Sequence, residues 1–155
     1  HVELSSEPGR GSCFCLRVPL RLSILPALMA GVAGHALAIP LSSVRDVFPF
    51  DADAVQRIAS QPNLVRGGSR TPLVSLRQRF ALPAADDAAL VVMLERGARR
   101  GGIVVDRVHG REEIVVKPLG AALAGKVPFS GAAVLGDGRI ALVLDPEPLL
   151  MAQAA

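Results

Sequence analysis

The sequence predicts a mainly β protein built from two small, similar units. Short apolar runs recur along its 155 residues and are bounded by Gly, Pro or charged residues, which is typical of strands and turns. Half of the residues are hydrophobic, enough to form packed cores. An internal repeat is also visible, because apolar residues of the first unit recur in the second at one fixed offset. The matching pairs are Met29 and Met93, Ile39 and Ile103, and Val44 and Val108, with Leu41 matched by Val105. The repeat favours two small barrels over one sandwich.

The expected strands follow one another along most of the chain. They are SCFCLRV at 12–18, ALMAGVA at 27–33, HALAIPL at 35–41, RTPLVSL at 70–76, ALVVMLE at 89–95, GGIVVDRV at 101–108, EEIVVKPL at 112–119, AAVLG at 132–136 and RIALVLD at 139–145. Helix signals are few. Asp51 or Asp53 is a candidate cap for a short helix over AVQRIAS at 54–60, and PEPLLMAQAA at 146–155 predicts a terminal helix.

Residues 22–44 contain no Lys, Arg, Asp or Glu, and this run is long enough to span a bilayer. Pro26 and Pro40 interrupt it, and the apolar runs fall on either side of Gly34. This pattern predicts a hairpin rather than a membrane span. The acidic start HVELSSEPGRGS disfavours a signal peptide. We expect a domain boundary between Pro19 and Pro26, where a polar segment gives way to apolar strands.

Composition and charge exclude several classes of function. The net charge is only +3 and the basic residues are spread along the chain, so nucleic acid is not favoured as a partner. The absence of Tyr and Trp also disfavours single-strand binding. Cys13 and Cys15 have no other cysteine to pair with, and no histidine lies at ligand spacing from them, which leaves a zinc site without support. We expect both to be small residues on one face of a strand, and free thiols suggest the cytosol.

Three patterns resemble catalytic motifs but lack essential parts. GAALAGK at 120–126 has the spacing of a phosphate-binding loop, yet Val127 and Pro128 stand where a Ser or Thr and a helix are needed. The adjacent acids at 86–87 and 112–113 point apart on a strand or loop, so they form no acid–base couple. Ser42 and Ser43 have no acid placed to orient a histidine base. Catalysis by this chain is therefore not expected.

One polar pair is more informative. Asp46 in SSVRDV and Arg66 in NLVRGG would meet if they lay on adjoining strands. The alternative is two independent exposed charges that add little stability, and composition alone favours it.

In order along the chain, these segments resemble the C-terminal part of a chemotaxis histidine kinase of the CheA type. VELSSEPGRGSCFCLRVPL is similar to the closing segment of the kinase's GHKL ATP-binding domain. LSILPALMAGVAGHALAIPLSSVRDV is similar to the start of its regulatory domain, and NLVRGGSRTPLVSLRQRFAL, GGIVVDRVHGREEIVVKPLG and SGAAVLGDGRIALVLD continue it. The resemblance implies a GHKL remnant at residues 1–20 and a CheW-like regulatory domain at residues 21–155. The implied fold is two SH3-like five-stranded barrels side by side with few short helices.

The same resemblance implies a function without chemistry of its own. Such a domain docks the kinase onto the adaptor CheW and the cytoplasmic tip of methyl-accepting chemoreceptors, in a parent kinase dimer. Receptor signals then alter autophosphorylation. The resemblance implies no cofactor in this chain, since ATP and Mg bind elsewhere in the full kinase. It also implies a cytoplasmic protein, associated with the membrane through receptor arrays and without direct membrane insertion.

The resemblance assigns partner contacts to four residues. Val44 and Asp46 match the strand that faces receptor, Arg66 matches the arginine of the family's NLRG turn, and Val108 is the second unit's counterpart of Val44. In related adaptors the matching arginine and acid pair, so we expect an ion pair between Asp46 and Arg66. Ser75 departs from the acidic residue often seen in adaptors, and the turn at GSRT is shorter and more basic.

Three other functions remain as alternatives. A stand-alone CheW-type adaptor would lack the segment GRGSCFCLRVPL that precedes the first barrel. A small nucleotide hydrolase would depend on Lys126 of GAALAGK. A small membrane protein would use residues 22–44. Independently of any family, barrels this small cannot bury all of a half-apolar chain, so we expect exposed apolar surface of the kind that marks protein interfaces.

Overall fold

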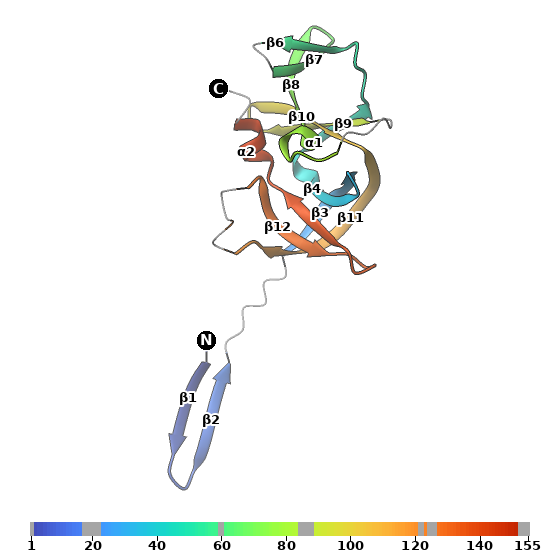
Figure 1. Ribbon diagram of the computed structural model, residues 1–155. Coiled ribbons are helices and arrows are strands. Elements are labelled where there is room, and N and C mark those ends of the chain that lie inside the picture. The colour runs from blue at the N-terminus through green and yellow to red at the C-terminus, as the bar shows by residue number, and fades with distance from the viewer. Residues whose placement is uncertain are drawn as a thin grey trace.

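The computed structural model describes residues 2–16, 23–58, 61–83, 89–120, 123 and 127–151. Within these residues the chain is mainly β (Figure 1). The strands are β1 (Val2–Glu7), β2 (Gly11–Leu16), β3 (Ser23–Val32), β4 (His35–Pro40), β5 (Val44–Pro49), β6 (Val55–Ile58), β7 (Gln61–Arg66), β8 (Ser69–Ser75), β9 (Leu90–Arg96), β10 (Arg99–Val105), β11 (Arg107–Pro118), β12 (Phe129–Val134) and β13 (Ile140–Leu144). The helices are the 3₁₀ turn η1 (Leu41–Ser43), α1 (Leu76–Arg79) and α2 (Pro146–Met151).

Five strands form a closed barrel, here called barrel A. Its order is β11–β12–β13–β4–β3, and the ring closes where β11 pairs with β3. The contact between β13 and β4 is parallel, whereas its neighbours are antiparallel. Strand β11 is twelve residues long, which lets one strand reach both β3 and β12.

The other main sheet, here called barrel B, has the order β5–β9–β10–β8–β7–β6. Its two end strands follow one another in the chain, joined by residues 50–54. The Val65 N–H donates to the Ala54 carbonyl at 2.8 Å, so this connection bends across to β7. Strands β5 and β6 therefore act as the two arms of one interrupted strand. The expected pair of five-stranded barrels is present, with this break in the second.

The internal repeat corresponds to a repeat in strand pairing at an offset of 64 residues. Met29 faces Ala38 across β3 and β4, just as Met93 faces Gly102 across β9 and β10. The third strand of each copy crosses to the other copy: Val44 on β5 pairs with Leu94, and Val108 on β11 pairs with Ala30. In both crossing strands the pairing register shifts directly after this valine, between Val44 and Asp46 and between Val108 and Gly110. Each barrel thus contains strands from both repeats.

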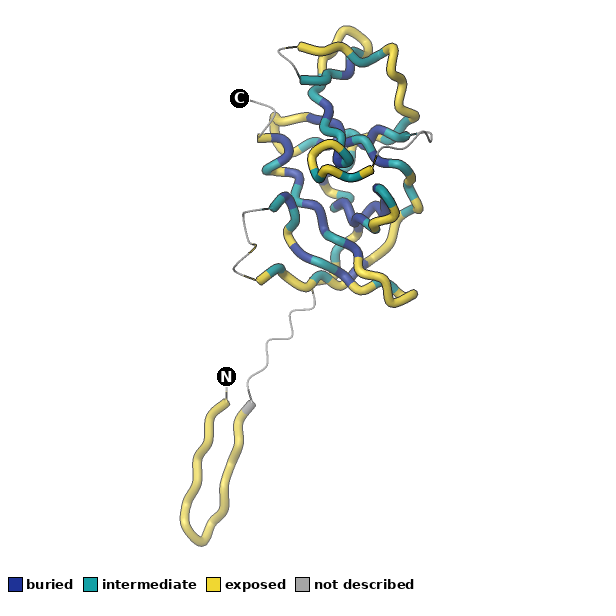
Figure 2. The backbone as a smooth tube through the Cα atoms, viewed as in Figure 1, coloured by how far each residue is buried: buried dark blue, intermediate teal, exposed yellow. Residues whose placement is uncertain are grey.

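Alternation along the strands divides the buried residues among three clusters. The inside of barrel A is lined by Ala27, Met29, Ala38, Ile114, Ala133, Ala141 and Val143. The inside of barrel B is lined by Leu64, Leu73 and Val91, with Phe48 and Met93 packed against them. The opposite faces of β3–β4 and β9–β10 meet in the largest cluster, which includes Val32, Ile39, Leu94 and Ile103. The two barrels therefore share one continuous apolar interface (Figure 2).

The expected hairpin is present over residues 23–40, with Ala33 and Gly34 in its turn, while residue 22 lies outside the described residues. No helix in the described part of the chain is long and apolar enough to cross a membrane. The terminal helix expected over 146–155 is confirmed over 146–151 as α2, and residues 152–155 lie outside the described residues. The helix expected over 54–60 is wrong, because Val55 and Ile58 pair with β7 as part of β6. Helix α1, which the sequence analysis did not predict, begins after Ser75, whose Oγ accepts from the Gln78 N–H.

The first two strands form a separate hairpin, apart from the barrels in Figure 1. Each of residues 2–15 is exposed, including Val2, Leu4 and Phe14 (Figure 2). The register places Leu4 opposite Phe14. Cys13 and Cys15 are exposed free thiols that alternate with Phe14 on β2, as expected of two residues on one strand face.

Candidate docking surfaces

The fold brings Val44 and Val108 to equivalent positions. Each begins or nearly begins a crossing strand, and each is half-buried against the interface between the barrels. The chain reaches Val44 through η1 and reaches Val108 directly from β10. The expectation that Val108 is the structural counterpart of Val44 is confirmed by their pairing with Leu94 and Ala30.

The expected ion pair between Asp46 and Arg66 is wrong. Strand β5 pairs with β9 and β7 pairs with β8, and the side chains of Asp46 and Arg66 each have another partner. The Asp46 carboxylate accepts from the Val47 N–H at 2.9 Å, and the Arg66 guanidinium lies 4.5 Å from the centroid of the Phe48 ring. Arg66 thus makes a cation–π contact. Among the ion pairs of the described residues, none joins Asp46 to Arg66.

An ion pair that the sequence analysis missed joins the two barrels. The Arg77 guanidinium on α1 donates from Nε and Nη2 to Asp106, at 2.8 and 2.6 Å. The Ala33 N–H in the β3–β4 turn donates to the same carboxylate at 2.6 Å. Both side chains are only 20% exposed. The hydrogen bond from Arg77 holds the pKa of Asp106 below its ordinary value, aided by the Ala33 N–H and opposed by burial.

Two cavities lie on either side of this ion pair, and both are lined by Arg77 and Asp106. One, of about 410 Å³, opens at the end of barrel A beside His35 and His109. The other, of about 480 Å³, lies beside Phe50 and Leu73 of barrel B. The pair therefore fixes the walls of two concave surfaces.

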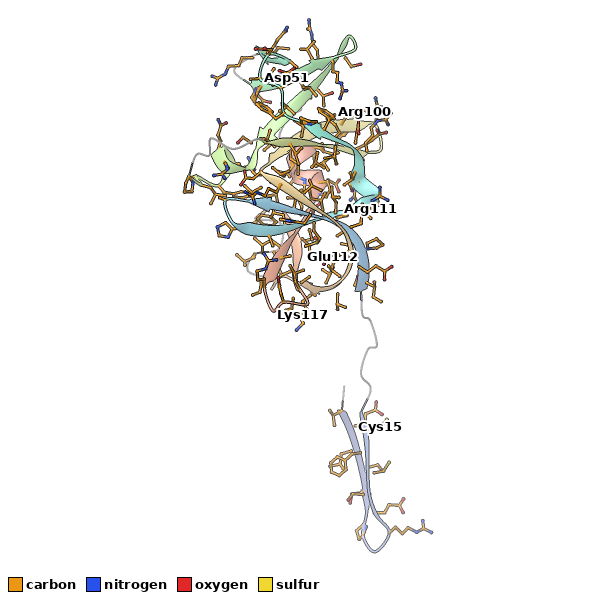
Figure 3. All side chains as sticks on the ribbon, turned by 90° about the vertical axis from the view of Figure 1, so that its right-hand side faces the viewer. Cys15, Asp51, Arg100, Arg111, Glu112 and Lys117 are labelled. Carbon is orange, nitrogen blue, oxygen red and sulfur yellow. The ribbon has the colours of Figure 1, made fainter. Side chains whose placement is uncertain are left out.

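Barrel A also exposes apolar side chains on its outer surface. Ile24 on β3 faces Val115 on β11, and Val134 on β12 faces Ile140 on β13. Their exposed fractions are 59, 42, 60 and 65%, respectively. We call these four residues the apolar row. Lys117 and Glu112 lie on the same barrel (Figure 3). Exposed β-branched residues on neighbouring strands are typical of protein contacts rather than of isolated surface variation.

The catalytic motifs considered from sequence gain no support. Most of GAALAGK and the acids at 86–87 lie outside the described residues, and RIALVLD forms β13. No group of three His, Cys, Asp or Glu side chains that could hold a metal ion occurs within the ranges that the structure describes.

Two interlocked small barrels that share an apolar interface define the class of tandem SH3-like barrel domains. Within this class the chain belongs to the CheW-like domain family, whose model matches residues 26–154. The crystal structure of the scaffolding protein TtCheW from Thermoanaerobacter tengcongensis has a similar fold. Its TM-score is 0.65 at 17% identity, over 78% of this chain and 88% of that one.

The resemblance to the CheA type of kinase is also confirmed. The chain is 31% identical to chemotaxis protein CheA of Rhizobium meliloti over 97% of its own length and 21% of the relative's. For CheA of Bacillus subtilis the values are 31%, 97% and 23%, and for CheA of Salmonella typhimurium they are 34%, 96% and 23%. The chain thus spans roughly a fifth of the length of these proteins.

Proposed function

We propose that this chain is the regulatory and docking domain of a chemotaxis histidine kinase. It binds the adaptor CheW and the cytoplasmic tip of chemoreceptors, so that receptor signals alter autophosphorylation by the parent kinase dimer. The observation that carries this proposal is the similarity to CheA proteins over 97% of the chain. A match of that extent includes most of the residues before position 26, where the family model begins.

Residues 1–20 belong, in this proposal, to the end of a GHKL ATP-binding domain, and residues 21–155 form the regulatory domain. The hairpin of β1 and β2 supports this division, since it has exposed apolar residues and shares no sheet with the barrels. A two-stranded hairpin is marginally stable alone, which is consistent with its belonging to a larger sheet. ATP and Mg would bind elsewhere in the full kinase, in the cytoplasm at the receptor array.

The apolar row is the surface that we assign to the adaptor. Its side chains are largely exposed and lie on neighbouring strands of a rigid closed barrel, which gives a partner a preformed apolar patch. Val44, Asp46, Arg66 and Val108 remain the residues proposed for receptor contact. Val44 and Val108 are half-buried at the junction of the barrels, and Asp46 and Arg66 are exposed.

A free CheW-type adaptor is the alternative, favoured by the structural similarity to TtCheW. That similarity covers 78% of the chain, whereas the CheA matches cover up to 97%. The hairpin of β1 and β2 is therefore the segment that distinguishes the two functions.

Calorimetric titration with the cognate CheW adaptor tests the proposal, because the chain has no Trp or Tyr for fluorescence. We expect saturable binding that Ile24→Lys or Ile140→Lys weakens by about tenfold or more. The matched control is Leu4→Lys, which places the same charge on a side chain that is 62% exposed and outside the CheW-like domain.

Equal binding by the row variants and the control would reject the apolar row as the adaptor surface. No binding by the unmodified chain at high micromolar concentration would reject the docking function itself. Thermal unfolding of each variant identifies any loss of binding that comes from misfolding.

A further inference from the structure

Four arginines gather near the turn between β9 and β10 on barrel B. Arg96 ends β9, Arg99 and Arg100 begin β10, and Arg45 lies on the adjoining strand β5. All four are exposed or about half exposed, and Arg100 is labelled on the outer surface of this barrel in Figure 3. We call Arg96, Arg99, Arg100 and Arg45 the arginine cluster.

The pairing of the hairpin places two of these charges against each other. Arg96 lies directly opposite Arg99 across the two strands. Like charges at directly opposed positions destabilise a sheet. The next pair along the hairpin, Glu95 and Arg100, has opposite charges, so the unfavourable pair is confined to the turn.

The acids around the cluster do not neutralise it. Glu95 is shared by Arg45 at 2.5 Å and Arg100 at 3.3 Å. Glu147 on α2 lies 3.7 Å from Arg96, with both side chains about half exposed. Within the described part of the chain, the Arg99 side chain has no hydrogen-bond or ion-pair partner. Four arginines against two glutamates leave an excess of positive charge at one turn.

The repeat provides an internal control for this arrangement. In barrel A the equivalent opposed pair is Val32 and His35, on either side of a two-residue turn. That turn forms without any arginine, so the fold does not need the charges at 96 and 99. A feature that costs stability and that the fold does not require is best explained by binding.

A cavity of about 220 Å³ lies between the opposed arginines. It is lined by Arg96, Ala98, Arg99, Glu147 and Leu150. We propose that this cavity binds an acidic side chain from a partner protein, with Arg96 and Arg99 donating to its carboxylate. The surrounding arginine cluster then favours further acidic residues in the same segment of the partner.

A protein carboxylate is favoured over a lipid or nucleic acid phosphate. Glu95 already shows a carboxylate held between two arginines of this cluster. The cavity has Ala98 and Leu150 in its wall, which suits the methylenes of a Glu side chain. No Tyr or Trp exists for base stacking. This inference does not rest on the proposed function, because it concerns barrel B and not the apolar row.

The test is a titration of the ¹⁵N-labelled full chain with a capped hexaglutamate peptide, followed by NMR, with hexaglutamine as the neutral peptide. We expect saturable shifts of the amides of Gly97, Ala98 and Arg99. Arg99→Ser should weaken binding by about tenfold, whereas Arg111→Ser on barrel A, which removes the same charge, should leave it unchanged. Arg99→Ser should not lower Tm, since it removes a like-charge contact.

Equal loss of affinity in both variants would overturn the proposal, because binding would then follow net charge alone. A lower Tm for Arg99→Ser would assign the arginine to stability instead. Binding to phosphatidylglycerol vesicles that Arg99→Ser abolishes, without any response to hexaglutamate, would assign the cluster to a membrane surface. Failure of adaptor binding leaves this test unaffected.

Discussion

The two repeats place one helix at each end of the barrel interface, and the contacts of these helices differ sharply. Arg77 on α1 and Glu147 on α2 occupy equivalent positions, two residues after Ser75 and Asp145, which each cap their helix. The Arg77 guanidinium donates two hydrogen bonds to the Asp106 carboxylate, and both side chains are 20% exposed. The Glu147 carboxylate lies 3.7 Å from the Arg96 guanidinium, and both side chains are about half exposed. The same backbone therefore supports a tight ionic joint on one side and a loose, basic surface on the other.

The ion pair between Arg77 and Asp106 is strengthened because several hydrogen bonds converge on Asp106. The carboxylate of Asp106 receives hydrogen bonds from α1 and from the β3–β4 turn, while its own N–H donates to the Gly31 carbonyl at 2.9 Å. Ser42 stands at the equivalent position of the first repeat and cannot accept a bidentate guanidinium. One side of the molecule is thus specialised for rigidity, and the other presents the exposed arginine cluster.

Breaking the tight joint should give the largest effect. Asp106→Asn removes the negative charge from a pair that is 20% exposed and weakens both hydrogen bonds from Arg77, so we expect a loss of about 3 kcal/mol in the free energy of unfolding. Glu147→Gln at the loose joint should change it by less than about 0.5 kcal/mol. Urea unfolding of both variants measures the difference. Equal losses would show that the two joints do not differ in energy.

The same comparison has a pH dependence. Arg77 lowers the folded-state pKa of Asp106 relative to the unfolded chain, in which it is about 3.9. The unfolded state therefore binds the proton first as the pH falls, and the contribution of the pair to stability is lost through the lowered pKa. Above about pH 5 the free energy of unfolding of the wild type should exceed that of Asp106→Asn by the full difference. Below about pH 4 this difference should shrink. A constant difference in the free energy of unfolding over this range would contradict the role assigned to the Asp106 charge.

The insides of the barrels differ at one equivalent position. Barrel A has Ala38 where barrel B has Gly102, and a Cβ on Gly102 would lie 2.4 Å from Leu73 Cδ2. Gly102→Ala should destabilise the chain by about 2 kcal/mol, and adding Leu73→Val should recover part of this loss. Gly136→Ala is the control, because no atom lies near its added methyl group. Thermal unfolding distinguishes the three.

The smallest effects concern Asp46 and Arg66. Because these residues do not pair, a double-mutant cycle of Asp46→Ala and Arg66→Ala should give a coupling energy within about 0.3 kcal/mol of zero. The cycle of Arg66→Ala with Phe48→Leu should give about 0.5–1 kcal/mol, from the cation–π contact. A larger coupling between Asp46 and Arg66 would restore the ion pair that the sequence suggested.

Much of the architecture was predictable because it is local or repetitive. The apolar runs located most strands, and the matched residues Met29 and Met93 occupy equivalent strands. The short helix over 54–60 was mispredicted because Val55 and Ile58 are paired by tertiary contacts with β7, which override local capping signals.

The contacts between distant strands were harder to predict. The sequence does not show where side chains point, so Asp46 and Arg66 were assumed to pair, although Arg66 packs over the Phe48 ring and Asp46 accepts from the Val47 N–H. Arg77 and Asp106 are 29 residues apart and meet only because the third strand of each repeat crosses to the other barrel. Aligning PLVSLRQ at 72–78 with LVLDPEP at 142–148 would have exposed Arg77, opposite Glu147, as a departure between the repeats.

The crossing of β5 and β11 has a consequence for synthesis of the chain on the ribosome. Strands β3 and β4 emerge early, but the barrel that they begin closes only when β11, β12 and β13 have followed. Until then Met29 and Ala38 lack the partners Ile114 and Val143 that cover them. Contacts of such long sequence separation form slowly and leave apolar strands open to aggregation. A nascent chain stopped before β13 therefore contains an unclosed barrel and is a natural substrate for chaperones.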